Sequence, residues 1–449
     1  MRSPTRASGA PDVARKRQPL PITLRGYRML TRALTPFAPL VLKHRMNRGK
    51  EDPARLIERR GRTQVARPDG PVIWVHGASV GELLSVFPLI ERLRSDDWHI
   101  LVTSGTTTSA VLAQERLPAD VIHQFIPLDT PRYIEDFLDY WDPSIGLFVE
   151  SDLWPNLIVA SAERKFPLLI VNGRLSERSF QRWRAFHGTA RALMSRIELC
   201  LAQSAMDANR FSQLGVQQVQ VTGNLKLDVP APPVNEKNLS AMRIAAGGRP
   251  VVVAASTHAG EEIAMIEAHR RLRQFVPDLL TIIAPRHAQR GREIYDIAEN
   301  AGLVPAMRSQ RQLPDRHTQV YVADTMGELG LFYRLASIVF MGGSLIEHGG
   351  QNPIEPIKLG AAVVHGPHVW NFAEIYAALD ASHGAEEVDD PAKLAACMGH
   401  WLKNGAARMS TAAAAQKTVD RLSGALERTL SQLDPYLMQL RIDHRAHYA

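Results

Sequence analysis

The stretch PVIWVHGASVGE, residues 71–82, constrains the fold of this chain more than any other segment. A β-branched apolar run with Val72, Ile73 and Val75 leads into a loop of small residues, and a helical period follows from Glu82 onward. A buried strand, a tight turn and a helix in this order form the opening unit of a doubly wound α/β domain. Such domains bind ligands at the carboxyl ends of their strands, so we expect a site near Glu82.

The position of Glu82 allows two interpretations. A carboxylate in the first turn of a helix, above a loop of small residues, can serve as a general base. Ser79 and Glu82 also have the S-x-x-E spacing of a capping box, in which the glutamate only bonds a backbone amide. Most such boxes are structural, so the local pattern by itself favours capping over catalysis.

The length of 449 residues predicts two α/β domains. Short β-rich runs alternate with helical stretches, which predicts a parallel sheet in the first half. The expected strands of that half are 71–76, 98–104, 121–126, 144–150, 167–172, 198–202 and 219–222. Three prolines without apolar periodicity predict a hinged linker at 229–238. We therefore expect domains at 61–228 and 239–430, followed by a C-terminal tail at 431–449.

Positive charge is concentrated at the start of the chain. Residues 1–60 carry 15 Lys and Arg against 4 Asp and Glu, whereas the remaining 389 carry 38 against 42. The slightly acidic body argues against nucleic acid as a partner, and the basic arm suits an anionic membrane surface or a phosphorylated lipid. Residues 1–20 have the composition of a disordered arm and lack the apolar core of a secretory signal.

Residues 21–60 form a separate N-terminal segment. Its part 21–46 places Leu30, Leu34, Phe37 and Val41 at helical spacing among several cations. The longest uncharged stretch is ten residues with two prolines, too short for a span of about 20 residues. A helix lying in the membrane interface and a helix packed on the next domain explain this pattern equally well.

Two more charged residues are expected beside Glu82. Glu150 ends a predicted buried strand, and the carboxyl ends of parallel strands share one edge of a sheet, so Glu150 should point into the same cleft. Asp152, which follows, could cap the helix that begins at Trp154-Pro155, but capping gives no reason for Glu150. Lys226 precedes the linker and is either a surface lysine or a cation for an anionic donor at the mouth of an interdomain cleft.

The second half has four strand ends that carry small, hydroxyl or charged residues. They are 256–262 (STHAGEE), Pro285-Arg286-His287, Met326-Gly327-Glu328, and Asn352-Pro353-Ile354-Glu355 after glycine pairs at 342–343 and 349–350. Amides at a helix start and an arginine at a strand tip suit a phosphate, and the glycines let backbone approach a ligand. In the last motif we expect asparagine at the N-cap, proline at N1 and glutamate at N3, with the glutamate near ribose hydroxyls.

The sequence has no pattern typical of a zinc site or of a disulfide framework. None of the 16 histidines has zinc-site spacing, so His258, His287, His348 and His368 are expected to be hydrogen-bonding residues. The two cysteines, Cys200 and Cys397, lie in different halves, which indicates a reducing compartment without disulfides.

Eight segments together resemble the Kdo transferases, where Kdo is 3-deoxy-D-manno-octulosonic acid. They are HGASVGE, ESDLWPN, NGRLSERS, VTGNLKLD, ASTHAGEE, APRH, MGELGLFY and GGQNPIEP, in order between about 45 and 430. The resemblance implies a GT-B fold of two Rossmann-like domains facing a central cleft, with acceptor bound by the first and CMP-sugar by the second. It also implies attachment of the N-terminal helical segment to the cytoplasmic face of the inner membrane.

The reaction that the resemblance implies is inverting transfer of Kdo from CMP-Kdo to a lipid A precursor of the lipid IVA type, with release of CMP and without metal or other cofactor. Carried over by motif, Glu82 is the general base, and Glu150 and Lys226 stabilise the transition state. CMP is held by Pro285, Arg286, Met326, Gly327, Glu328, Asn352, Pro353, Ile354 and Glu355.

The chain departs from the family at its N-terminus, where a basic, proline-containing arm replaces a more continuously apolar segment. Two alternatives to Kdo transfer remain at the level of sequence. One is a GT-B enzyme that uses another nucleotide sugar, as a UDP-sugar transferase or an epimerase. The other is a non-enzymatic scaffold at the membrane surface with a nucleotide-sensing domain.

Overall fold

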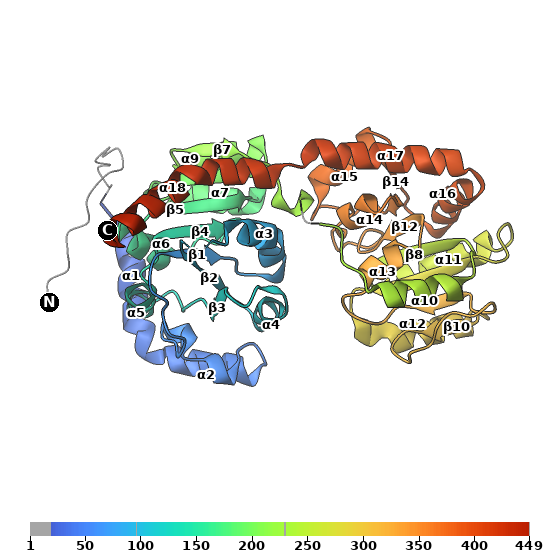
Figure 1. The fold of residues 1–449 in the computed structure, drawn as a ribbon, viewed down its shortest axis with the longest axis horizontal. Coiled ribbons are helices and arrows are strands. Elements are labelled where there is room, and N and C mark those ends of the chain that lie inside the picture. The colour runs from blue at the N-terminus through green and yellow to red at the C-terminus, as the bar shows by residue number, and fades with distance from the viewer. Residues whose placement is uncertain (1–18, 96, 229, 449) are drawn as a thin grey trace. The chain divides into compact units, whose positions relative to one another are not determined.

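The computed structural model describes residues 19–448 except 96 and 229, so most of the predicted arm at 1–20 lies outside the described residues. The chain forms two compact units (Figure 1). The first runs to Val229 and also includes the residues from Ser423 onward, and the second is Pro230–Leu422.

The first unit is built on a seven-stranded parallel sheet with the order β3-β2-β1-β4-β5-β6-β7. Its strands are β1 Val72–His76, β2 His99–Ser104, β3 Ile122–Phe125, β4 Ile145–Val149, β5 Leu168–Gly173, β6 Leu199–Ala202 and β7 Val219–Val221. All seven expected strands are confirmed. The strand order reverses between β1 and β4, and the carboxyl ends at such a switch point form a crevice where ligands bind.

Helices cover both faces of this sheet. They are α3 Val80–Leu93, α4 Thr107–Arg116, α5 Pro131–Trp141, α6 Pro155–Glu163, α7 Glu177–Ala185, α8 His187–Met194 and α9 Ala205–Leu214. Successive residues of a strand point to opposite faces, so Trp74 packs with α5, α6, α8 and α9, whereas Ile73 and Val75 pack with α3 and α4. Burial on both faces explains why the central strands β1, β4 and β5 read as continuous apolar runs.

The N-terminal segment folds onto the first unit as α1 Ile22–Leu34, the 3-10 turn η1 Thr35–Phe37 and α2 Ala38–Asn47, followed by the turns η2 Pro53–Arg55 and η3 Glu58–Arg60. Leu24 of α1 is buried in the core, and the Tyr27 hydroxyl donates to Asp129 at 2.8 Å. Among the helices of the described residues, none combines the length and the apolar character needed to cross a bilayer.

The second unit has a second seven-stranded parallel sheet, with the order β10-β11-β9-β8-β12-β13-β14. Its strands are β8 Val251–Thr257, β9 Leu280–Pro285, β10 Pro305–Met307, β11 Val320–Val322, β12 Ile338–Met341, β13 Ala362–His365 and β14 Ala385–Glu387. Its helices are α10 Glu236–Ala246, α11 Glu261–Leu272, α12 Gly291–Asn300, α13 Leu329–Tyr333, α14 Ile354–Lys358, α15 Ala373–Ala381, α16 Pro391–Lys403 and α17 Gly405–Leu422, with the 3-10 turn η5 Ala288–Arg290. The predicted doubly wound fold is therefore confirmed in both units.

The C-terminal residues differ from the predicted tail. The chain turns at Gly424, whose φ of +86° suits glycine, and then forms the helix α18 Ala425–Tyr448. Leu433 and Leu437 of α18 belong to the same core cluster as Ile73 and Val75. The residues expected to form a tail are thus helical and complete the core of the first unit (Figure 1).

Candidate active site

Glu82 lies in the first turn of α3, directly beyond the carboxyl end of β1. Its Oε2 accepts a hydrogen bond from the Ala78 amide at 2.7 Å, and its Oε1 accepts one from the Ser79 hydroxyl at 2.9 Å. Ser79 is the N-cap of α3 and accepts from the Glu82 amide at 3.4 Å. The carboxylate thus has a capping role, although the amide that it bonds belongs to the residue before the N-cap.

The electrostatic surroundings of Glu82 suit a base as well. Burial raises the pKa of Glu82, the nearby charges of Glu150 and Asp152 raise it further, and the hydrogen bonds from Ser79 and Ala78 act in the opposite direction. A raised pKa makes a carboxylate a better proton acceptor, as general-base catalysis near neutral pH requires. Capping and catalysis are therefore compatible at this residue.

Glu150 and Lys226 form an ion pair at the same end of the first sheet. Glu150 follows β4 directly and has a φ of +60°, a left-handed conformation that is uncommon outside glycine. Its Oε1 accepts from Lys226 Nζ at 2.8 Å, and both side chains are about one-fifth exposed, 18% and 23%. Lys226 lies in the 3-10 turn η4 Leu225–Leu227, whose two leucines are buried. A strained glutamate, held by a lysine beside the sheet's switch point, is typical of a functional site.

Asp152 does not cap α6, contrary to one of the expectations from sequence. It accepts hydrogen bonds from the Trp154 indole at 2.7 Å and lies 3.0 Å from Nε2 of the buried His76. Burial raises the pKa of Asp152, but the interactions with His76 and Trp154 outweigh burial and bring this pKa below its usual range. The first amides of α6 are instead capped by Asp129, from the loop after β3, at 3.2 Å to Asn156 and 3.1 Å to Leu157.

In the second unit, one buried carboxylate joins two strand-end loops. Glu261, the first residue of α11, has no solvent exposure and accepts four backbone hydrogen bonds. Its Oε2 accepts from the amides of His258 and Gly343 at 2.9 and 2.7 Å, and its Oε1 from those of Ser344 and Leu345 at 2.9 and 3.0 Å. The sequence predicts that backbone near Gly343 approaches a ligand, but its amide bonds the protein's own glutamate.

Arg286 lies where its side chain could bind an anion. It follows β9, whose last residue Pro285 is buried, and its amide donates to Thr257 at 2.9 Å. The Arg286 side chain is exposed, and within the described part of the chain its guanidinium makes no hydrogen bond or ion pair. A free guanidinium at the carboxyl edge of a parallel sheet can bind a phosphate.

Three histidines gather beside Arg286. The His258 ring lies 3.8 Å from that of His348 and 5.9 Å from that of His287, measured between ring centroids. Burial and the neighbouring histidine and arginine charges lower the pKa of His258 to about 4, so this ring is neutral at pH 7. Among the residues that the structure describes, no group of three or more His, Cys, Asp or Glu side chains could hold a metal ion. No local sequence pattern indicates that these three rings lie together.

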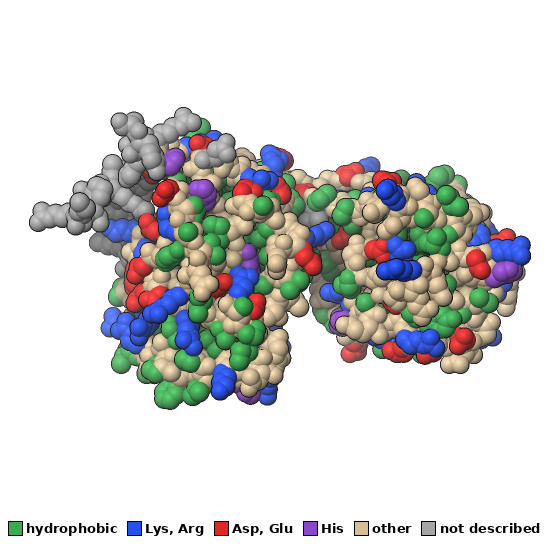
Figure 2. All heavy atoms as spheres, turned by 60° about the horizontal axis from the view of Figure 1, so that its bottom comes forward, with side chains coloured by type: hydrophobic (Ala, Val, Ile, Leu, Met, Phe, Trp, Pro, Cys, Tyr) green, Lys and Arg blue, Asp and Glu red, His purple; other side chains and the backbone are tan. Residues whose placement is uncertain are grey.

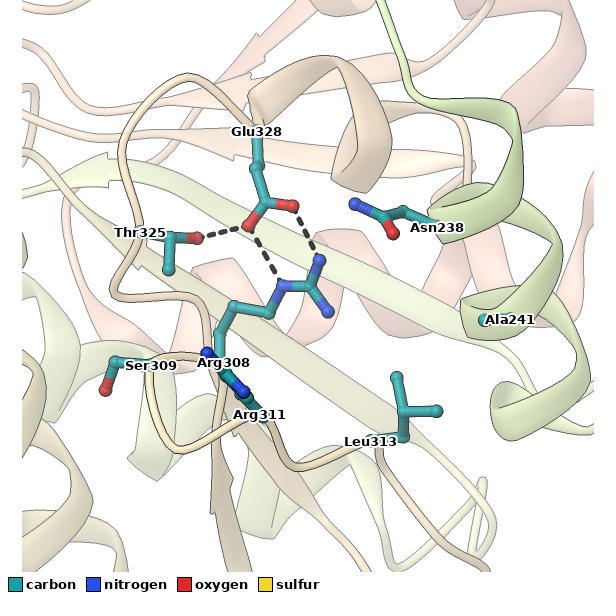
Figure 3. Close-up of a pocket in the computed structure, with 8 residues that line it drawn as sticks. All are labelled: Asn238, Ala241, Arg308, Ser309, Arg311, Leu313, Thr325 and Glu328. Atoms are coloured by element: carbon teal, nitrogen blue, oxygen red, sulfur yellow. Dashed lines mark hydrogen bonds and ion pairs between the residues drawn. The ribbon is translucent and has the colours of Figure 1, made fainter.

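Met326, Gly327 and Glu328 form the loop between β11 and α13. The Met326 side chain is 68% exposed, and Gly327 has a φ of +79°. Glu328 accepts two hydrogen bonds from Arg308, at 2.9 and 2.6 Å, and one from Thr325 at 2.5 Å (Figure 3). The bonds from Arg308 hold the pKa of Glu328 below its usual range.

Glu328 and Arg308 line a polar cavity of about 500 Å³. Figure 3 shows its lining side chains, which come from α10, the loop after β10 and the loop after β11: Asn238, Ala241, Arg308, Ser309, Arg311, Leu313, Thr325 and Glu328. Of these, only Glu328 was expected from the sequence, because Arg308 follows a three-residue strand that carries no clear pattern.

The motif Asn352-Pro353-Ile354-Glu355 starts a helix one residue later than predicted. Helix α14 begins at Ile354 and has five residues, and Pro353 occupies the N-cap position. Asn352 Oδ1 accepts from the Ile354 amide at 3.1 Å, so the asparagine does stabilise the helix start. Asn352 and Glu355 are partly exposed, whereas Pro353 and Ile354 are buried.

The sequence is similar to known proteins along most of its length. Residues 54–229 match the family model for 3-deoxy-D-manno-octulosonic-acid transferase (kdotransferase). The 3-deoxy-D-manno-octulosonic acid transferase of Haemophilus influenzae is 35% identical over 394 residues, which cover 85% of this chain and 91% of the relative. The transferase of the same name from Bordetella pertussis is 32% identical over 386 residues, 83% of this chain and 90% of the relative.

Solved structures show the same fold at low sequence identity. UDP-GlcNAc 2-epimerase from Neisseria meningitidis matches with a TM-score of 0.55 and 13% identity over 80% of this chain and all of that one. A glycosyltransferase from Rickettsia africae matches with a TM-score of 0.54 and 11% identity over 82% and 99%. These structural matches show the GT-B fold alone. Sequence identity above 30% to the two transferases shows common ancestry with them. The chain belongs to the family of the 3-deoxy-D-manno-octulosonic acid transferases, the Kdo transferases.

Proposed function

We propose that this protein transfers Kdo from CMP-Kdo to a lipid A precursor of the lipid IVA type and releases CMP. Family membership supports the reaction class. The observation that carries the proposal is the cluster of Glu82, Glu150 and Lys226 at the switch point of the first sheet, where one carboxylate has a raised pKa and the other is paired with a cation.

In the proposed mechanism Glu82 accepts the proton of an acceptor hydroxyl as that oxygen attacks the anomeric carbon of Kdo. The new C–O bond forms on one face of the sugar while the bond to the CMP phosphate breaks on the other, so the configuration inverts. Positive charge develops on the sugar, where Glu150 stabilises it, and negative charge develops on the leaving phosphate, where Lys226 does. Their ion pair holds both groups ready before substrate arrives.

The donor is proposed to bind the second unit, with the acceptor on the first. The free guanidinium of Arg286 suits the phosphate of CMP, next to Pro285. Met326, Gly327 and Glu328 and the segment from Asn352 to Glu355 provide the remaining contacts to the nucleotide. A CMP-sugar has a single phosphate, so one cation and backbone amides can meet its charge, and we propose that transfer needs no metal ion.

The N-terminal segment is proposed to lie on the cytoplasmic face of the inner membrane. One side of it packs on the first unit through Leu24, Ala38 and Leu42. The other side exposes large apolar side chains: Ile22, Met29, Leu30, Leu34, Phe37, Leu40 and Val41. Residues 19–50 carry seven Lys and Arg and no Asp or Glu. Figure 2 shows hydrophobic side chains with Lys and Arg among them over this part of the first unit, as an interfacial segment on anionic lipid requires.

The test is transfer by the purified protein from CMP-Kdo to lipid IVA, with the product identified by mass spectrometry. We expect the mass of the acceptor to rise by whole Kdo units, and Glu82→Gln to lower the rate by about 10² to 10⁴. CMP affinity of Glu82→Gln, measured by calorimetry, should match that of the wild type. Absence of any Kdo adduct, or binding of UDP in preference to CMP, would contradict the proposal and favour another nucleotide sugar.

A further inference from the structure

Asn172 lies near the end of β5 and is enclosed by the elements that carry Glu82 and Lys226. It has no solvent exposure, and its φ of +53° is left-handed, a conformation that asparagine tolerates better than most residues. Its carbonyl accepts from the Gln203 side chain at 3.0 Å. The proposed reaction assigns no role to this residue.

The Asn172 side chain bridges the two elements. Its Oδ1 accepts from the amide of Leu225 at 3.0 Å, and Leu225 opens the turn η4 in which Lys226 lies. Its Nδ2 donates to the Ser85 hydroxyl at 3.4 Å, and that hydroxyl donates to the Glu82 carbonyl at 2.6 Å. A path of three hydrogen bonds therefore connects the backbone of Glu82 with the turn of Lys226.

This path is sealed from water. Ser85 and Leu225 are each 1% exposed, so no solvent can replace a bond that is lost there. The Lys226 amide is held as well, because it donates to Asn224 Oδ1 at 3.0 Å. Buried polar networks that are fully bonded fix the relative positions of their members.

We propose that Asn172 is a positioning residue, which sets the distance between Lys226 and the base Glu82. This inference rests on the proposed function, in which both residues act. Lys226 donates to Glu150 at 2.8 Å, and the charge of Glu150 is one cause of the raised pKa of Glu82. If the turn of Lys226 shifts, Glu150 loses its counter-ion and repels the ionised form of Glu82 more strongly.

The deciding variant is Asn172→Gly, because glycine keeps the left-handed backbone without strain and removes only the side chain. We expect kcat to fall roughly 10- to 100-fold, as displacement of catalytic groups by about 1 Å does. The KM for CMP-Kdo should stay unchanged, because the residues proposed to hold CMP lie in the second unit and Lys226 is proposed to act on charge that develops only in the transition state. The acid limb of the kcat/KM profile should move to higher pH, because the pKa of Glu82 rises.

Two further variants separate positioning from a merely structural role. Asn172→Asp keeps the acceptor for the Leu225 amide and tolerates the same φ, so we expect it to retain more activity than Asn172→Gly. The matched control is Thr281→Val, which removes a buried hydrogen bond of 2.8 Å to His269 in the core of the second unit. It should lower the melting temperature but leave kcat and the acid limb unchanged.

If Asn172→Gly folds and keeps the wild-type kcat and the wild-type acid limb of the kcat/KM profile, the inference is overturned. It is also overturned if the glycine and aspartate variants lose the same factor in kcat while the acid limb of both stays in place. If the glycine variant does not fold, Ser85→Ala replaces it: this variant removes the acceptor of Asn172 Nδ2, and an unchanged kcat and limb count against positioning. Glu82→Gln and Lys226→Met are assayed in parallel. Full transfer by these two contradicts the proposed function, whereas their failure beside an active Asn172→Gly contradicts only the inference.

Discussion

Replacing Glu261 tests how the second unit is held together at the carboxyl edge of its sheet. Glu261→Ala leaves four buried amides without their acceptor, those of His258, Gly343, Ser344 and Leu345. Each such loss costs at least about 1 kcal/mol, so the unit should lose about 4 kcal/mol of unfolding free energy or more. With a urea m-value of about 2 kcal/mol/M, the midpoint for this unit falls by about 2 M.

The conservative variant gives a second, graded magnitude. Glutamine keeps an oxygen for Ser344 and Leu345, but its amide nitrogen then faces the two N–H groups of His258 and Gly343. Glu261→Gln should therefore cost about half as much, roughly 2 kcal/mol.

Hydrogen exchange by mass spectrometry in increasing urea follows each unit separately, which matters because a two-unit protein need not unfold in one step. Glu347→Gln is the control, since Glu347 is an exposed carboxylate in the same loop as Gly343. Peptides from 256–262 and 342–346 should lose protection first in Glu261→Ala. If its midpoint equals that of Glu347→Gln, the four hydrogen bonds do not hold these loops together and the reasoning is refuted.

The other expected outcomes concern the first unit. Glu150→Gly should be about 1 kcal/mol more stable than Glu150→Ala in chemical denaturation, because glycine adopts the positive φ without strain, although both should lose transfer. The kcat/KM profile should fall on its acid side at a pH above the ordinary glutamate value of 4.5, since Glu82 must be ionised and its pKa is raised; Glu150→Gln should move that limb to lower pH. Replacing both Arg25 and Arg32 by Gln should weaken binding to anionic vesicles by about 2 kcal/mol, which is a loss of affinity near 30-fold in a co-sedimentation assay. Binding to neutral vesicles should not change. An unshifted limb in Glu150→Gln would contradict the electrostatic coupling to Glu82.

The sequence predicted the fold where local pattern and burial agree. The central strands β1, β4 and β5 of the first sheet are buried on both faces, so each reads as an apolar run between turn residues. The strands β10 and β14 were missed because each has three residues at a sheet edge and no apolar run. Residues 431–449 were expected to form a tail, whereas α18 continues to Tyr448, and no local pattern says which of two cores such a helix packs on.

The sequence predicted where the candidate site lies, but it did not predict the hydrogen bonds and ion pairs within the site. Glu82 and Glu150 follow from the rule that parallel strands end at one edge, and the structure places both there. The capping of α6 by Asp129 and the three bonds of Glu261 to the loop at 343–345 connect residues 27 to 84 positions apart, which no local pattern reports. The ion pair of Arg308 with Glu328 also joins two loops that only tertiary structure brings together.

The return of α18 to the first unit has a consequence for biosynthesis. Leu433 and Leu437 leave the ribosome only after the whole second unit has been translated. Until then the nascent first unit lacks the helix that packs on α3 and η4, and the apolar side chains that α18 covers there are open to water and to chaperones. The half of the protein that is made first is therefore the half that matures last, and fusions or truncations after Leu422 should impair the amino-terminal half of the molecule.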